Sequence, residues 1–135
     1  MNTKIKVQTV ISPDTAPANT MYTKNIDMRE LSEVIFAGTI AGEGAKYTMT
    51  AEGIDDDATP KVCEPIEFSY TINDGEQKIA DPEKGVEVNA SEDICVYINS
   101  QWLGKVGATD VRLKFVKKTA GTALSFFACN LGARY

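Results

Sequence analysis

The segment "IEFSYTI" at residues 66–72 shows the pattern that decides the fold. Apolar residues occupy every second position from Ile66 to Ile72, and polar residues stand between them. Successive side chains of a β-strand point to opposite faces of the sheet, so this alternation predicts a strand with one buried and one solvated face.

Two further segments repeat this period of two. "KYTMTAE" at 46–52 sends Tyr47, Met49 and Ala51 to one side, and "VRLKFVKK" at 111–118 alternates in the same way. Parallel sheets are usually covered on both faces, whereas antiparallel sheets often have one face in water. The three segments therefore predict an antiparallel sheet.

Turn-forming residues separate the apolar runs. "AGEGA" at 41–45, "NDG" at 73–75, "DPEKG" at 81–85, "NASED" at 89–93 and "TAGT" at 119–122 supply Gly, Asn or Asp, which suit tight turns. The spacing predicts one all-β domain of roughly seven to nine short strands, an antiparallel β-sandwich of jelly-roll type. Its predicted core contains Phe36, Phe68, Leu113, Phe115 and Leu124.

Two segments interrupt the strand pattern. "NIDMRELSEVI" at 25–35 predicts a single helical turn with Asp27 as its cap. "NSQWLGKVGATD" at 99–110 is irregular and holds the only tryptophan. We expect Trp102 to cover one open end of the sandwich; the alternative is a ligand platform formed by Tyr97 and Trp102.

The first residues differ from the remainder. "KIKVQTVI" at 4–11 is a candidate strand, and the segment after it contains two prolines and has the composition of a linker. We interpret residues 1–19 as an arm and linker and residues 20–135 as the β-sandwich domain. The arm can add a strand to its own sheet or to the sheet of a neighbour.

Composition narrows the function class. The net charge is -5, and no aromatic platform or recognition motif accompanies the basic residues, so we expect no nucleic-acid partner. No segment has the roughly 20 apolar residues of a membrane span, and no signal peptide is evident, which predicts synthesis in a cytoplasm and no membrane partner. Cys63, Cys95 and Cys129 cannot all pair, and we expect them to be reduced and buried.

Residues that carry chemistry are scarce. The chain has no histidine, which removes the usual general base and metal ligand. "IDDDATP" at 54–60 lacks the spacing of a calcium loop, and "GTIAGEGAK" at 38–46 lacks the spacing of a nucleotide-binding loop. A glycosidase carboxylate pair is neither supported nor excluded by residue types. We expect no enzyme activity, no catalytic residues, no cofactor and no metal.

Several segments together resemble small virion proteins of tailed bacteriophages and prophages. They are "EVIFAGTI", "KYTMTAEG", "DICVYI" and the terminal stretch from residue 109, with the sharpest matches in "VRLKF", "TAGTA" and the ending "GARY". The resemblance covers residues 20–135 and leaves the arm outside. It implies a β-sandwich that serves as a structural component of a virus particle.

The resemblance favours a head decoration protein, with a minor head or tail protein as the related possibility. Such a protein is made in the host cytoplasm and resides in the virion. It binds the major capsid protein or other virion proteins, and it forms a homo-oligomer such as a trimer. The competing interpretation is a carbohydrate-binding or adhesin-like β-sandwich module.

The terminal strand "ALSFFAC" at 123–129 has apolar residues on both faces, so both faces need cover. We predict that a neighbouring subunit or the arm supplies part of that cover; a loop of the same chain is the alternative. The predicted interface residues are Ile5, Val7, Ile11, Phe127, Arg134 and Tyr135.

Overall fold

The computed structural model describes residues 5–11, 20–23, 25–29, 31–39, 46–55, 62–89, 91–104, 107–119 and 127–133. Their elements, in chain order, are β1 (Ile5–Ile11), β2 (Thr20–Tyr22), β3 (Ile26–Asp27), β4 (Leu31–Thr39), β5 (Lys46–Asp55), β6 (Val62–Ile66), β7 (Ser69–Ile72), β8 (Lys78–Ile79), β9 (Val86–Asn89), β10 (Asp93–Asn99), α1 (Ser100–Gly104), β11 (Asp110–Thr119) and β12 (Phe127–Ala133).

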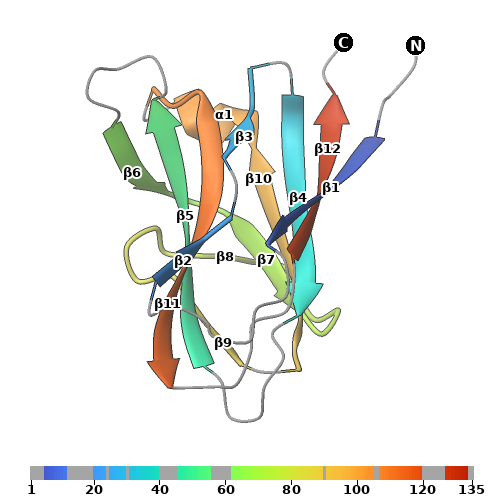
Figure 1. Ribbon diagram of the computed structural model, residues 1–135, viewed down its shortest axis with the longest axis vertical. Helices are drawn as coiled ribbons and strands as arrows, with labels where there is room; N and C mark the ends of the chain where they lie inside the picture. The colour runs from blue at the N-terminus through green and yellow to red at the C-terminus, as the bar shows by residue number, and fades with distance from the viewer. Residues whose placement is uncertain are drawn as a thin grey trace.

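These strands form two sheets that lie as two layers (Figure 1). The first sheet has the order β1-β12-β4-β10-β7-β8, and the second has the order β2-β11-β5-β6. β3 also pairs with β11, and β9 also pairs with β5. Every pairing is antiparallel, which confirms the predicted all-β antiparallel sandwich.

The strand pairs are nested along the chain. β1 pairs with β12, β2 with β11, β4 with β10 and β5 with β6, so the early strands meet the late strands in reverse order. Successive long strands also change sheets, as β4 and β5 do. Nested pairing across two sheets is the arrangement of a jelly roll, here with short strands added.

The alternating segments form the core as predicted. Tyr47, Met49 and Ala51 of β5 are completely buried, and so are Leu113 and Phe115 of β11. Register explains the packing, since Leu113 lies opposite Ala51 and Phe115 lies opposite Met49. The predicted core residues Phe36 and Phe68 are likewise buried, whereas Leu124 lies outside the described residues.

The segment at 66–72 is not one continuous strand, contrary to the prediction. β6 ends at Ile66 in the second sheet, and β7 begins at Ser69 in the first, so the chain crosses between the layers at Glu67 and Phe68. The apolar alternation of the sequence continues through the crossing, but the burial follows it only as far as Phe68: Tyr70 and Ile72, which were predicted to be buried, are only partly buried. Ser69 departs from the alternation, being buried, and its hydroxyl accepts a hydrogen bond from Gln77 Nε2 at 2.8 Å.

The predicted helical turn at 25–35 is also wrong, because the described part of this segment forms β3, a turn and the start of β4. Ile26 and Met28 are both buried two positions apart, which is strand spacing. Asp27 stabilises the turn instead of a helix: its carboxylate accepts the Arg29 N–H at 2.9 Å and forms an ion pair with the Arg29 guanidinium at 2.7 Å.

The segment at 99–110 contains the short helix α1, which the sequence pattern did not indicate. The Asn99 side chain accepts the Gln101 N–H at 2.8 Å, as an N-cap residue does. Leu103 is buried, and Trp102 packs against the core at this end of the sandwich.

Candidate functional site: the outer groove and the first-sheet edge

A groove of about 540 Å³ lies on the outer face of the second sheet, and we call it the outer groove. Thr48, Thr50 and Glu52 of β5 and Lys114 and Val116 of β11 contribute to it. Pro65 of β6 and the loop residues Pro82 and Glu83 complete the lining. Two central strands therefore supply most of the lining, and a proline from each of two other segments adds to it.

The loop that carries Pro82 and Glu83 is held by its own hydrogen bonds. The Asp81 carboxylate accepts the backbone N–H groups of Lys84 at 3.0 Å and Glu83 at 2.9 Å, and these bonds lower the pKa of Asp81. Gly85 follows with a φ of +67°, a conformation that glycine adopts readily. A Cβ at this glycine would lie 2.4 Å from the Met49 carbonyl oxygen, so the loop is seated directly on β5.

Charged side chains around the groove are partly paired. Lys118 forms an ion pair with Glu87 at 2.7 Å, and Lys46 lies 3.9 Å from the same carboxylate. The hydrogen bond from Lys118 is the main cause of the lowered pKa of Glu87. By contrast, none of the hydrogen bonds and ion pairs among the described residues involves the Lys114 ammonium group.

The Arg112 side chain of β11 contacts residues of three other strands of the second sheet, next to the groove. Its Nε donates to Glu52 of β5 at 2.9 Å, and its guanidinium lies 3.9 Å from the centre of the Tyr22 ring of β2. Its terminal nitrogen also lies 3.8 Å from the Cys63 sulfur of β6. This guanidinium thus contacts β2 and β5, which flank β11, and also β6 on the far side of β5.

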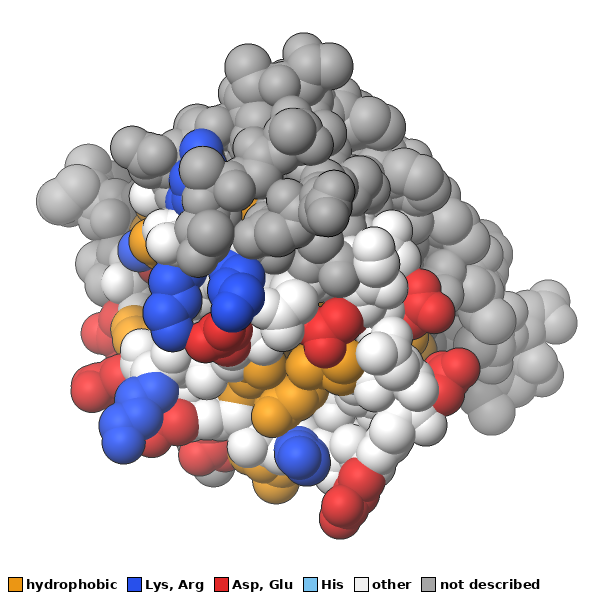
Figure 2. Space-filling view, turned by 90° about the horizontal axis from the view of Figure 1, so that it is seen from below, with side chains coloured by type: hydrophobic (Ala, Val, Ile, Leu, Met, Phe, Trp, Pro, Cys, Tyr) orange, Lys and Arg blue, Asp and Glu red, His pale blue; other side chains and the backbone are white. Residues whose placement is uncertain are grey.

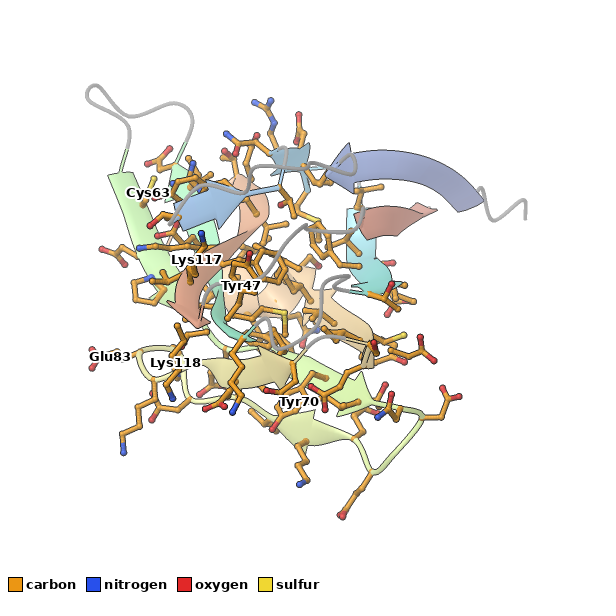
Figure 3. All side chains as sticks on the ribbon, turned by 60° about the horizontal axis from the view of Figure 1, so that its bottom comes forward. Tyr47, Cys63, Tyr70, Glu83, Lys117 and Lys118 are labelled. Atoms are coloured by element: carbon orange, nitrogen blue, oxygen red, sulfur yellow. The ribbon has the colours of Figure 1, made fainter. Side chains whose placement is uncertain are left out.

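Cys63 is exposed, which contradicts the expected burial of all three thiols. Cys63 lies on β6 (Figure 3), which is an edge strand among the described strands, and its sulfur is close to the Arg112 guanidinium. Cys95 is half-buried, and the Cys129 side chain lies outside the described ones. The expected burial rested on residue type, because free cysteine is usually buried, and residue type does not show that this strand lies at an edge.

The outer groove offers an ammonium group, two threonine hydroxyls and carboxylates beside an apolar surface. Such groups can hold a polar partner by hydrogen bonds and ion pairing, while the apolar surface packs against it. Around the lower end of the molecule, Figure 2 shows basic and acidic side chains intermixed around a small hydrophobic area. Among the described side chains of that face, no extended region carries a single charge that would steer a polyanion.

The two aromatic residues of the predicted ligand platform lie in different settings. Tyr97 is in β10, where Ser69 is its register partner, and Ser69 in turn is opposite the exposed Ile79 of β8. Trp102 lies in α1 and packs against the core. Among the described side chains, the aromatic ring pair is Phe68 with Tyr70, at 6.1 Å, and does not join Tyr97 to Trp102.

Four of the six predicted interface residues, Ile5, Val7, Ile11 and Phe127, lie on β1 and β12 at one edge of the first sheet. β1 pairs with β12 of the same chain, so the arm adds a strand to its own sheet (Figure 1). Ile11 is opposite Phe127, Val7 is opposite Asn130, and Ile5 is opposite Gly132. Arg134 and Tyr135 lie outside the described residues.

Several residues of these surfaces were not found from the sequence. Lys114 and Val116 looked like an ordinary solvated strand face, and the loop residues Pro82 and Glu83 looked like part of a turn. Ile79 is 68% exposed, and it lies with Ala80 between two turn segments, a run too short to predict which side chain is exposed.

The described residues hold no cluster of three or more His, Cys, Asp or Glu side chains arranged to bind a metal ion. Within the same ranges, no helix has the length and apolar character needed to cross a membrane. Figure 3 shows Tyr47 in the interior and Glu83 on the outside of the molecule.

Comparison with known proteins gives a similarity of fold. No protein-family model matches the sequence, and no curated protein is similar to it in sequence. The structure is similar to the crystal structure of the SPBc2 prophage-derived protein YomS, with a TM-score of 0.56 and 10% sequence identity. The similarity covers 98% of this chain and 96% of that chain, so the two proteins share their fold from end to end.

Proposed function

We propose that the protein is a non-enzymatic structural component of a tailed-bacteriophage particle, and specifically a decoration protein of the head. The observation that carries this proposal is the end-to-end similarity of fold to a prophage-derived protein. The resemblance of residues 20–135 to small phage virion proteins points in the same direction. Jelly rolls are also a recurrent architecture of viral capsid domains.

The surfaces suit a protein that acts through contacts. The outer groove presents the Lys114 ammonium group and two threonine hydroxyls, and β1 leaves one edge of the first sheet open among the described strands. We assign the major capsid protein as the partner, with synthesis in the host cytoplasm and residence on the virion. A net charge of -5 favours a position on the outside of the head, away from packaged DNA.

A carbohydrate-binding module is the weaker candidate. Aromatic recognition of a sugar needs rings that are exposed together on one surface. Trp102 packs against the core, and Tyr97 lies on β10, where no ring contact joins it to Trp102 among the described side chains.

The direct test is to locate the protein in particles. The chromosomal copy is given a small epitope tag, particles are induced from the strain that carries it, and they are purified on a density gradient. We expect the tagged chain to band with full heads and immunogold label to lie on heads. Recovery only in the soluble fraction would overturn the proposal, and label confined to tails would replace the head assignment with a tail role.

Two truncations test which ends bind the particle. Removing residues 1–19, or removing Arg134 and Tyr135, should leave a folded domain with reduced occupancy on heads that lack the protein. Circular dichroism checks the fold, and co-sedimentation with the stripped heads measures occupancy. Wild-type occupancy of both truncated chains would remove the chain ends from the particle contact.

A further inference from the structure

Among the described strands, β1 is the longest that lies at a sheet edge. It runs over seven residues and pairs with β12 on one side. On its other side, no strand of the described ranges pairs with it. An edge of this kind presents a row of backbone N–H and C=O groups that can pair with another strand.

The other edges carry features that discourage such pairing. β8 is two residues long and includes Lys78, β2 is three residues long, and β6 contains Pro65, which has no N–H to donate. β1 has no proline and a single charged residue, Lys6. Its one irregularity is a register shift between Thr9 and Ile11, which leaves Ile5–Thr9 as a regular edge.

The sequence of that regular edge complements itself. When two copies of Ile5–Thr9 run antiparallel about Val7, Ile5 of each copy is opposite Thr9 of the other, and Val7 is opposite Val7. Lys6 is then opposite Gln8, so the two lysines are not opposed. Pairs of β-branched residues are favourable cross-strand neighbours, and directly opposed like charges are not.

We propose that two copies of this chain associate through β1, with antiparallel pairing centred on Val7, so that the first sheet continues from one copy into the other. A two-fold contact of this kind is closed, because each copy uses the same edge. The resulting homo-oligomer is a dimer, and not the trimer that the resemblance to virion proteins suggested. The contact does not depend on attachment to a particle, so this inference and the proposed function can fail separately.

Cysteine cross-linking tests the register. Directly opposed residues of an antiparallel pair have Cα atoms about 4.5–5.5 Å apart, within disulfide range. In the proposed register, the two Ile5 positions are offset by four residues, or about 13 Å, which is too far. Val7→Cys should therefore give a covalent dimer on mild oxidation, whereas Ile5→Cys should behave like the wild-type chain with its native cysteines.

Peptide mass spectrometry identifies the bond, which should join the two substituted positions. Equal cross-linking of the two variants would overturn the register, and no cross-linking above wild type in either would overturn the contact. Light scattering on the wild-type chain should give twice the chain mass of 14.7 kDa, and removal of residues 1–11 should return the monomer mass. A wild-type chain that is monomeric at high concentration would also overturn the proposal.

Two charge substitutions at Gln8 test the register in a second way, because they should change the dimer affinity in opposite directions. Gln8→Glu creates two Lys–Glu pairs across the contact and should tighten the dimer about threefold to tenfold, whereas Gln8→Lys should weaken it by a similar factor. Analytical ultracentrifugation measures both dissociation constants. High salt should shrink the difference. Equal dissociation constants for the two variants would contradict the Lys6–Gln8 register.

Discussion

The β5–β11 pair and the β1–β12 pair are built alike and placed differently. Both are antiparallel, and each has one register shift near an end. β11 is flanked by β2 and β3, and β5 is flanked by β6 and β9, so both strands of the first pair have neighbours on each side. In the second pair, β12 has β4 beside it, whereas β1 is an edge among the described strands.

Because of this difference, substitutions in the two pairs should affect different properties, namely stability in the first pair and self-association in β1. The backbone groups of a central pair are used within the domain, so a change there should lower the free energy of unfolding. An edge strand has half of its backbone groups available to another chain. A change in β1 should therefore affect self-association more than folding.

The largest effect should come from the centre of the second sheet. Phe115 is completely buried opposite Met49, and Phe115→Ala should lower the free energy of unfolding by about 3–5 kcal/mol. Removal of residues 1–19 should cost less, because β12 keeps its pairing with β4. Urea denaturation of both variants measures the two losses. A truncated chain that is less stable than Phe115→Ala would break the comparison between centre and edge.

The loop seated on β5 should show the next largest effect. Gly85→Ala places a Cβ 2.4 Å from the Met49 carbonyl oxygen at a φ of +67°, and strain of this kind costs about 1–3 kcal/mol. Gly107→Ala is the matched control, because Gly107 has a φ of +69° and the added Cβ would have no described residue beyond its chain neighbours within 4 Å.

Both variants carry the backbone strain of a positive φ. The difference between their melting temperatures therefore measures the effect of the contact with β5. We expect Gly85→Ala to melt at the lower temperature. Equal melting temperatures would mean that the loop moves away from β5 without cost, and the outer groove would then lack a fixed wall.

A smaller effect is expected on the outer face of the same sheet. Arg112→Ala removes the bond to Glu52 and the stacking on Tyr22, each worth up to about 1 kcal/mol at partly exposed sites. Arg112→Lys keeps the charge but loses the planar guanidinium, so it should recover only part of the loss. Full recovery by lysine, measured by urea denaturation, would show that charge alone matters at this position.

Local patterns predicted much of this fold because they depend on neighbouring residues. The alternation in β5 and β11 predicted their buried faces, and "NDG" predicted a turn with positive φ, which Asn73 and Asp74 adopt. The crossing at Glu67 and Phe68 was missed, since the period of two continues from one sheet to the other.

The outer groove depends on contacts between segments far apart in the sequence. Pro65 and Pro82 line it together only after β6 and the 81–85 loop have both docked on β5. The composition of the arm indicated a strand, but only the register shows that Ile11 meets Phe127. No local pattern contains either relation.

The smallest predicted effect is the pH dependence that arises from Asp81. Its pKa is lowered by the N–H groups of Lys84 and Glu83, so the folded state favours the ionised carboxyl. This contribution to stability is complete above the ordinary aspartate pKa of about 3.9, and it is lost as the pH falls through the lower folded-state pKa. Asp81→Asn keeps a side-chain oxygen as acceptor but cannot ionise, so its melting temperature should fall less than that of the wild-type chain between about pH 5 and pH 2.

Glu76→Gln, at an exposed position outside this loop, is the control and should follow the wild-type profile. If Asp81→Asn and the wild-type chain lose the same stability over this range, the carboxylate does not hold the loop in solution. The position of Pro82 and Glu83 over the groove must then come from the remaining contacts, which include the hydrogen bond from the Gly85 N–H to the Asp81 carbonyl at 2.9 Å and the pairing of β9 with β5.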